Sequence, residues 1–328
     1  MPFVNKSNFF KPESAPFYNP KDQRKVALIT GGNSGIGWFT ALHLYLHGYI
    51  VYVAGRTESK VLKAIEDIKV EAEKRKGSNP TGELNYIHID LTDLSTVPKA
   101  VDQFSEKEQS LDILINNAGL MGVPYEVTKD DYEIQYQVNF VSHFLLTMKL
   151  IPFLENAAEK GVTPRIVNLA SVGHNFEFKH IPPEKNKLNN FPNSIYTWVR
   201  YGLAKTSQIQ FAKELAVKYP TILSLSVHPG VIIGTELYNY WKNLPVIGLA
   251  AKGVFAAADK TIGVSVEEGS LASLRAALDP SLTLKENGSY FTTGGTIDNP
   301  SKIASNPEYA EETWTWNIEQ LKKRGFLV

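Results

Sequence analysis

The sequence predicts an α/β fold, in which a parallel sheet is covered by helices on both faces. Two observations support this prediction. From Lys25 onwards, short apolar runs alternate with segments whose apolar residues recur at helical spacing. Most of the strand-like runs are apolar at nearly every position, as a sheet buried on both faces requires. No internal repeat or long linker interrupts the chain. We therefore expect one doubly wound domain over residues 25–328, preceded by an N-terminal extension at 1–24.

The expected elements follow one another in a regular order. The expected strands are KVALIT (25–30), YIVYVAG (49–55), LNYIHIDL (84–91), LDILINNAG (111–119), RIVNLAS (165–171) and ILSLSVHPG (222–230). A helix should follow the first strand and stop at Gly48, where glycine permits the backbone to leave the helix. A second helix with charged faces should run from Glu58 to Arg75, and further helical segments separate the later strands.

Composition excludes several classes of function. The 34 basic and 34 acidic residues balance, so no net field favours nucleic acid. The chain has no cysteine, and its histidines are not spaced as a metal site, so we expect no metal. The N-terminus lacks the apolar core of a signal peptide. The most apolar later segment, 244–264, is interrupted by Lys252, Asp259 and Lys260, which argues against a membrane-spanning helix.

A glycine-rich turn, TGGNSGIG (30–37), lies between the first expected strand and the first expected helix. Glycines at this point of a doubly wound sheet permit a tight backbone path and let a pyrophosphate approach the N-terminus of the helix. We therefore expect a dinucleotide to bind this turn through Gly31, Asn33, Ser34, Gly35, Ile36 and Gly37.

The end of the second strand bears on the choice of dinucleotide. An NAD site would place a carboxylate here for the adenosine 2′-hydroxyl. This chain instead has Gly55 and then Arg56, whose guanidinium can pair with a 2′-phosphate. The alternative role for Arg56 is a solvated surface charge. The pattern favours NADP(H) over NAD(H).

The stretch SIYTWVRYGLAK (194–205) contains two tyrosines and one lysine. Hydride transfer to a carbonyl needs an acid beside the oxygen, and a tyrosine can serve if its pKa falls from about 10. A lysine four residues later on a helix lies on the same face. Tyr201 and Lys205 have this spacing, whereas Tyr196 lies nine positions before Lys205 and faces the other way. Tyr201 is therefore the expected acid and base.

These motifs together resemble the short-chain dehydrogenase/reductase superfamily, whose fold is of the Rossmann type. TGGNSGIG, NNAG (116–119), YGLAK (201–205) and HPG (228–230) occur in the order of that family. The resemblance implies that Ser171 polarises the substrate oxygen and that Asn139 completes a proton relay with Tyr201 and Lys205. It also implies cofactor contacts from Asp90, Leu91, Asn117, Gly119, Tyr201, Lys205 and Ile232.

Two regions are longer than in compact members of the family. Thirty residues separate Ser171 from Tyr201, and a second insertion follows HPG, so enlarged substrate loops are expected at about 172–200 and 234–266. Seven aromatic residues of these loops could cover an apolar pocket or simply pack: Phe176, Phe178, Tyr196, Trp198, Tyr238, Tyr240 and Trp241. One extra residue after HPG leaves open whether Thr235 makes the family's usual cofactor contact.

The long interval, RIVN, VHPG and NGSYF resemble the retinol-dehydrogenase-like branch, and HLYLHG, YNYW and LKKRGF resemble a fungal group of lipid-droplet oxidoreductases. We expect an NADP(H)-dependent oxidoreductase for an apolar, lipid-like substrate, located on the cytoplasmic side. Association with a lipid droplet or membrane surface, through the aromatic N-terminus or 238–264, is left open. Two alternatives are an NADPH-sensing lipid-droplet binding protein with incidental catalysis, and a sugar-nucleotide epimerase of the related larger fold.

Overall fold

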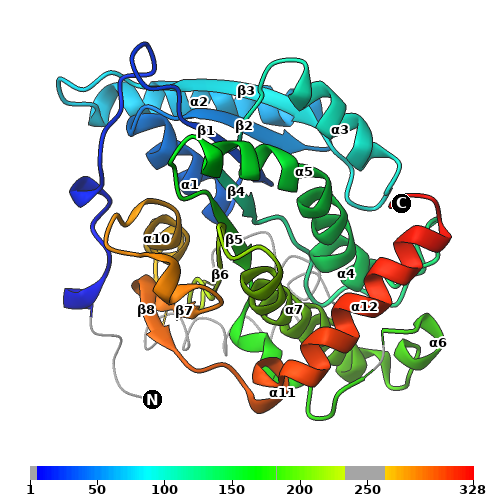
Figure 1. Ribbon diagram of the computed structural model, residues 1–328. Helices are drawn as coiled ribbons and strands as arrows, with labels where there is room; N and C mark the ends of the chain where they lie inside the picture. The colour runs from blue at the N-terminus through cyan, green and yellow to red at the C-terminus, as the bar shows by residue number, and fades with distance from the viewer. Residues whose placement is uncertain (1–5, 182, 233–262) are drawn as a thin grey trace.

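The computed structural model describes residues 6–181, 183–232 and 263–328 of the chain (Figure 1). Its strands are β1 (Val26–Thr30), β2 (Ile50–Gly55), β3 (Glu83–His88), β4 (Ile113–Asn116), β5 (Arg165–Leu169), β6 (Leu223–Val227), β7 (Tyr290–Thr292) and β8 (Thr296–Asp298). They form one sheet in the order β3-β2-β1-β4-β5-β6-β7-β8. Every neighbouring pair is parallel except β7 and β8, which are antiparallel.

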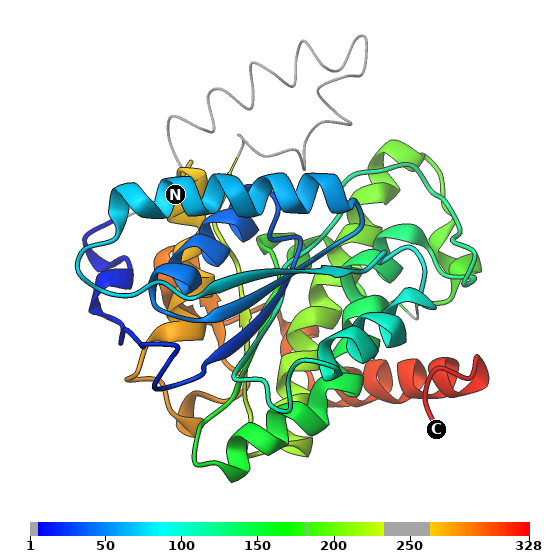
Figure 2. The ribbon, with the colours of Figure 1, turned by 90° about the horizontal axis from the view of Figure 1, so that it is seen from above.

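Helices cover both faces of this sheet (Figures 1 and 2). The α-helices are α1 (Gly35–Leu46), α2 (Glu58–Arg75), α3 (Thr96–Ser105), α4 (Ile134–Tyr136), α5 (Ser142–Glu159), α6 (Lys185–Leu188), α7 (Asn193–Lys218), α10 (Val266–Leu278), α11 (Lys302–Ser305) and α12 (Pro307–Lys323). Short 3₁₀ turns η1 (Lys6–Asn8), η2 (Pro12–Ser14), η4 (Val172–Phe176), η6 (Leu284–Glu286) and η7 (Thr293–Gly295) connect them, and η3 (Gln137–Val141) is a π turn.

The alternation of side chains along each strand divides the core into two halves. Ala27 and Ile29 of β1 face the cluster that contains α1, α2 and α10, whereas Val26 and Leu28 face the cluster that contains α3, α5 and α7. This alternation is the two-residue period of a strand, and both of its phases are apolar because helices lie on both sides.

The predicted fold class is confirmed. The six predicted strands correspond to β1 to β6, and α2 has the predicted bounds. Gly48 follows α1 with a φ of +84°, in the left-handed region that lets a helix end. The antiparallel edge made by β7 and β8 was not among the predicted strands. Within the described ranges, no helix is both long and apolar enough to cross a membrane.

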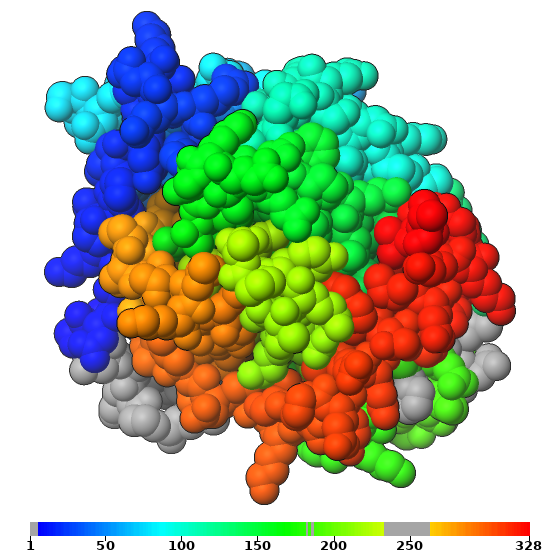
Figure 3. Space-filling view, viewed as in Figure 1, coloured from blue at the N-terminus to red at the C-terminus, as the bar shows by residue number. Residues whose placement is uncertain are grey.

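Residues 6–24 form an N-terminal strap along one side of the molecule. Its Tyr18 amide donates to the carbonyl of His47 at 3.0 Å, and its Phe10 amide donates to the carbonyl of Gly294 at 2.9 Å. Lys6 pairs with Glu268 of α10 at 2.6 Å. The strap thus joins the end of α1 to α10 and the β7–β8 edge, and Figure 3 shows the blue strap beside the orange part of the chain.

The long interval between Ser171 and Tyr201 is anchored by Arg200, which has no exposed surface. Its Nη1 donates to the carbonyl of Leu188 at 3.2 Å, and its Nη2 donates to the side chain of Asn193. Its Nε lies 3.4 Å from a carboxylate oxygen of Glu133, which is also fully buried. The guanidinium therefore connects α7, the chain before it and the start of α4.

Replacing Arg200 tests this anchor. Arg200→Met should lower the free energy of unfolding by about 3–5 kcal/mol, because it leaves the Glu133 carboxylate buried without its partner. Burial raises the pKa of Glu133 to about 7, so urea unfolding should be measured at pH 8, where the carboxylate is charged. The double variant Arg200→Met/Glu133→Gln should lose less than Arg200→Met alone. A double variant that loses the sum of the two single changes would contradict the pairing.

Candidate active site

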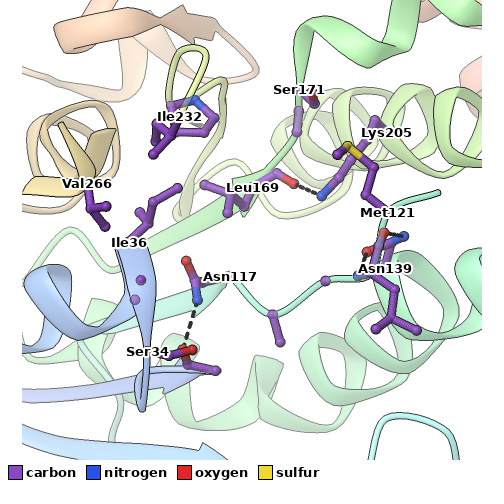
Figure 4. Close-up of a pocket in the computed structure, with 18 of the residues that line it drawn as sticks. Ser34, Ile36, Asn117, Met121, Asn139, Leu169, Ser171, Lys205, Ile232 and Val266 are labelled. Atoms are coloured by element: carbon purple, nitrogen blue, oxygen red, sulfur yellow. Dashed lines mark hydrogen bonds between the residues drawn. The ribbon is translucent and has the colours of Figure 1, made fainter. Parts of the chain in front are cut away.

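A pocket of about 740 Å³ opens at the carboxyl ends of β1, β4, β5 and β6. It brings together twelve of the residues predicted from the sequence: Gly31, Ser34, Gly35, Ile36, Gly37, Asn117, Gly119, Asn139, Ser171, Tyr201, Lys205 and Ile232. Figure 4 shows Ile36, Ile232 and Val266 on one side of the pocket and Ser171, Lys205, Met121 and Asn139 on the other. Residues from six separate parts of the chain thus share one site.

The glycine turn forms one end of the pocket. Gly31 and Gly35 have φ angles of +66° and +56°, which residues other than glycine rarely adopt. A Cβ at Gly37 would lie 2.4 Å from the carbonyl oxygen of Gly31. Ser34 precedes α1 in extended conformation and makes no capping bond through its side chain. The N–H groups at the start of α1 are therefore left for an anionic ligand, as a bound pyrophosphate requires.

Asn117 and Gly119 follow β4 and lie beside this turn. The Asn117 side-chain amide donates to the carbonyl of Thr30 at 2.8 Å and to that of Gly31 at 3.3 Å, which ties the two loops together. A Cβ at Gly119 would lie 2.6 Å from Oδ1 of Asn139. Glycine at position 119 therefore allows the loop to approach Asn139.

Asn139 lies in the π turn η3 and is fully buried. Its Oδ1 accepts the backbone N–H of Leu120 at 2.8 Å, and its Nδ2 donates to the carbonyl of Leu120 at 2.8 Å. The two bonds fix the amide against the loop that lines the pocket. A π turn inside a helix is a local irregularity that recurs at functional sites.

Ser171 and Tyr201 both lie against Gly173. The Ser171 hydroxyl accepts the backbone N–H of Gly173 at 3.0 Å. A Cβ at Gly173 would lie 2.6 Å from the Tyr201 ring and 3.3 Å from the Ser171 hydroxyl. Position 173 therefore has no room for a side chain, and its glycine allows the two reactive groups to come together.

Lys205 lies one helical turn after Tyr201 on α7, as the spacing predicted. Its Nζ lies 5.7 Å from the centre of the Tyr201 ring and donates to the carbonyl of Leu169 at 2.5 Å. Complete burial lowers the pKa of Lys205 from 10.5 to about 7, because the ammonium loses its hydration. The lysine beside the tyrosine is thus titratable near neutral pH.

Four other predicted residues do not line the pocket: Asn33, Arg56, Asp90 and Leu91. Arg56 directly follows β2 and is exposed. Asp90 follows β3 and accepts the backbone N–H and the hydroxyl of Thr92 at 2.9 and 2.7 Å. Asn33 belongs to the glycine turn itself, Arg56 follows β2, and Asp90 and Leu91 follow β3, the strand on the far side of β2 from β1. Their contacts with a cofactor remain predictions.

The aromatic residues expected to cover the pocket are placed differently. None of the four that the structure describes lines it. Phe178 is 83% exposed, Phe176 packs against Trp198, and the Tyr196 hydroxyl donates to the carbonyl of Lys187 at 3.4 Å. The prediction of an aromatic canopy is therefore not met by these four. Thr235, Tyr238, Tyr240 and Trp241 lie outside the described residues.

Sequence reasoning also missed residues that shape the site. The apolar walls that were not predicted are Trp38, Phe39, Ala118, Leu120, Met121, Val123, Leu169, Ala170 and Val266. Some of these residues could have been predicted from their position directly after a motif, since Trp38 follows Gly37 and Leu120 follows Gly119. In the described part of the chain, no group of three or more histidine or carboxylate side chains could hold a metal ion.

The sequence is similar to those of known oxidoreductases. A sequence model described as short chain dehydrogenase matches residues 25–183. A short-chain dehydrogenase/reductase of Aspergillus calidoustus is 34% identical over 95% of this chain and 98% of its own length. Human polyprenol dehydrogenase is 27% identical over 93% of this chain and 87% of its own length.

Solved structures show the same fold. RhlG of Pseudomonas aeruginosa, solved as an active-site complex with NADP, has a TM-score of 0.60 and 22% identity, covering 83% of this chain and 95% of that one. The agreement in sequence extends over nearly the whole length of the fungal relative. The chain therefore belongs to the short-chain dehydrogenase/reductase family of oxidoreductases, which use nicotinamide cofactors.

Proposed function

We propose that the protein is an NADP(H)-dependent oxidoreductase that acts on a carbonyl or alcohol carbon of an apolar, lipid-like substrate. The observation that carries this proposal is the convergence of Ser171, Tyr201 and Lys205 in one pocket with the glycine turn. When bound, a nicotinamide cofactor supplies or accepts the hydride.

The protein's own groups would then handle the substrate oxygen and its proton. The Ser171 hydroxyl already accepts the N–H of Gly173, so its own hydrogen can point to the substrate oxygen and polarise it. In the reductive direction, the Tyr201 hydroxyl gives its proton to that oxygen. The Lys205 ammonium would stabilise the phenolate that remains. Asn139, through its two bonds to the backbone of Leu120, would hold in place the loop that lines the pocket beside Lys205.

The walls of the pocket support an apolar substrate. Met121 lines it on the side of Lys205 and Asn139, and Ile36, Ile232 and Val266 line the opposite side (Figure 4). Trp38 and Val123 are also among its apolar lining residues. Pockets for such ligands are mostly apolar, with a few polar groups that fix orientation. The relative that acts on a lipid alcohol, human polyprenol dehydrogenase, supports the same class. Association with a lipid-droplet or membrane surface stays a prediction.

The preference for NADP(H) rests on Arg56. This guanidinium is exposed at the end of β2, next to the end of β1 from which the glycine turn starts. The Arg56 guanidinium could therefore pair with a 2′-phosphate. Gly55 has no side chain, so no carboxylate at this position would repel the phosphate. The NADP complex of the structural neighbour RhlG supports this choice.

The two tyrosines of α7 provide a matched test of the chemistry. Tyr201→Phe should lower turnover by at least about 1,000-fold, because the proton donor is lost while the ring remains. Tyr196→Phe, on the same helix, should retain turnover. NADPH affinity, measured by fluorescence titration, should stay within about threefold in both variants. Full activity of Tyr201→Phe on an aldehyde, retinoid and sterone panel would refute the assignment.

Reversing the charge at Arg56 tests the cofactor preference. Arg56→Glu should weaken NADPH binding by about 10- to 100-fold, the value of one charge-assisted contact, and change NADH binding much less. Lys63→Glu makes the same change of charge on the exposed face of α2, where Lys63 pairs with Asp67. That control should leave both affinities nearly unchanged. Equal losses for NADPH and NADH in Arg56→Glu would rule out a 2′-phosphate contact.

Burial of Lys205 also predicts how stability depends on pH. Its folded pKa of about 7 lies below the unfolded value of 10.5. Above pH 10.5 the lysine is neutral in both the folded and the unfolded state, and its burial carries no protonation cost. As pH falls from 10.5 toward 7, the unfolded state binds a proton that the folded state does not bind, so the folded state loses stability over this range. Lys205→Met should therefore be more favourable, relative to wild type, at pH 7 than at pH 10, by up to a few kcal/mol.

Urea unfolding of wild type and Lys205→Met at pH 7, 8, 9 and 10 measures this difference. Lys302→Met, at an exposed position of α11, is the control and should show a difference that hardly changes with pH. A constant difference for Lys205→Met across the series would mean that the buried lysine is not neutralised in this range.

A further inference from the structure

A fully buried histidine connects the two ends of the pocket without lining it. His143, near the start of α5, has its Nδ1 3.2 Å from the carbonyl oxygen of Asn139 and its Nε2 2.8 Å from the hydroxyl of Thr30. Thr30 is the last residue of β1 and has no exposed surface. The chain of bonds therefore runs from the π turn to the start of the glycine turn.

The partners of His143 fix the direction of each bond. A carbonyl oxygen only accepts, so the hydrogen of the ring must lie on Nδ1. The Thr30 hydroxyl accepts the backbone N–H groups of Asn117 and Ala118, both at 3.0 Å, and so its own hydrogen is free to donate to Nε2. Burial, with a contribution from the charge of Lys205, lowers the pKa of His143 to about 4 and keeps the ring neutral.

Three segments meet through this one side chain. The first carries Asn139, the second is the glycine turn that follows Thr30, and the third begins with Asn117 and Ala118. A ring protonated on Nε2 instead would offer a third donor to a hydroxyl whose two lone pairs already accept two N–H groups, and the hydrogen-bond chain would break. Only the neutral Nδ1–H form satisfies all four bonds.

We propose that His143 is a positioning residue, which holds Asn139 and the Asn117–Ala118 segment in a fixed relation across the pocket. The effect on reaction rate rests on the proposed function, because Asn139 would act beside Lys205. The effect on the loops does not. The carbonyl of Asn139 also accepts a hydrogen bond from the side-chain amide of Gln208. Replacing His143 therefore removes one of two side-chain hydrogen bonds to this carbonyl and leaves the other in place.

Two amide replacements can separate the two bonds of His143. In His143→Asn, the Nδ2 group takes the place of Nδ1 and can still donate to Asn139, but it cannot reach Thr30. In His143→Gln, Oε1 takes the place of Nε2 and can still accept from Thr30, but it cannot serve Asn139. His143→Leu keeps the apolar bulk and removes both bonds.

Each replacement has a separate expected outcome. His143→Gln should slow single-turnover hydride transfer on the order of tenfold and leave NADPH affinity nearly intact. His143→Asn should weaken NADPH binding severalfold, since the Asn117–Ala118 segment loses its support, and should change the rate less. His143→Leu should show both losses. His47→Leu is the matched control, since His47 is also buried between backbone carbonyls but at the N-terminal strap. His47→Leu should lower the midpoint of unfolding and leave the hydride-transfer rate and the NADPH affinity unchanged.

The tautomer can be read in the unmodified protein. The ¹⁵N signals of the His143 ring, assigned by their absence in His143→Gln, should show hydrogen on Nδ1 and none on Nε2 at pH 7. Hydrogen on Nε2, or unchanged rate and affinity in His143→Leu, would overturn the proposal. If wild type shows no turnover with NADPH, the proposed function fails, while the tautomer and the cofactor affinity still decide the role of His143.

Discussion

The close approach of α7 to the chain that leaves β5 is the contact on which the rest of the site depends. A Cβ at Gly202 would lie 2.9 Å from the carbonyl oxygen of Gly173 and 3.0 Å from the N atom of Glu177. The helix can therefore touch the backbone of η4 directly. This contact places Tyr201 beside Ser171 and lets Lys205 reach the carbonyl of Leu169. A larger residue at either glycine would separate the two halves of the reactive site.

The same helix carries two buried cations that the fold treats differently. Arg200 has a carboxylate, a carbonyl and an amide as partners, and a guanidinium does not lose its proton in a protein. Lys205 has one carbonyl, and a lysine readily becomes neutral when it is buried. Arg200 is therefore a permanent charge that fixes the chain before the helix. Lys205 can gain and lose its proton, as a residue of an acid–base site must.

Periodicity and motif order were enough to predict most of the scaffold. The first six strands, the bounds of α2 and the pairing of Tyr201 with Lys205 depend on local patterns, which a sequence displays directly. The strands β7 and β8 have three residues each, too few to show a period, and they are strands because they pair with β6 and with one another.

The walls of the pocket were not predictable in the same way. The direction of an aromatic side chain in a long loop depends on distant partners, as the exposed Phe178 shows. Gly173 was overlooked because a single glycine after a strand has many uses, and its meaning comes only from the ring of Tyr201 beside it. Likewise, His143 has no sequence motif of its own, and its two partners lie on different elements.

The N-terminal strap also has a consequence for the order in which the chain can fold during synthesis. One half of the strap bonds to His47, which is made soon after it. The other half packs Phe9 against Gly294 and pairs Lys6 with Glu268, which is synthesised 262 residues after Lys6. The N-terminal strap therefore waits for partners that are made long after it. A chain that stops before residue 294 would keep Phe9 and Phe10 without their partner glycine, and so an incomplete product would expose apolar surface at its N-terminus.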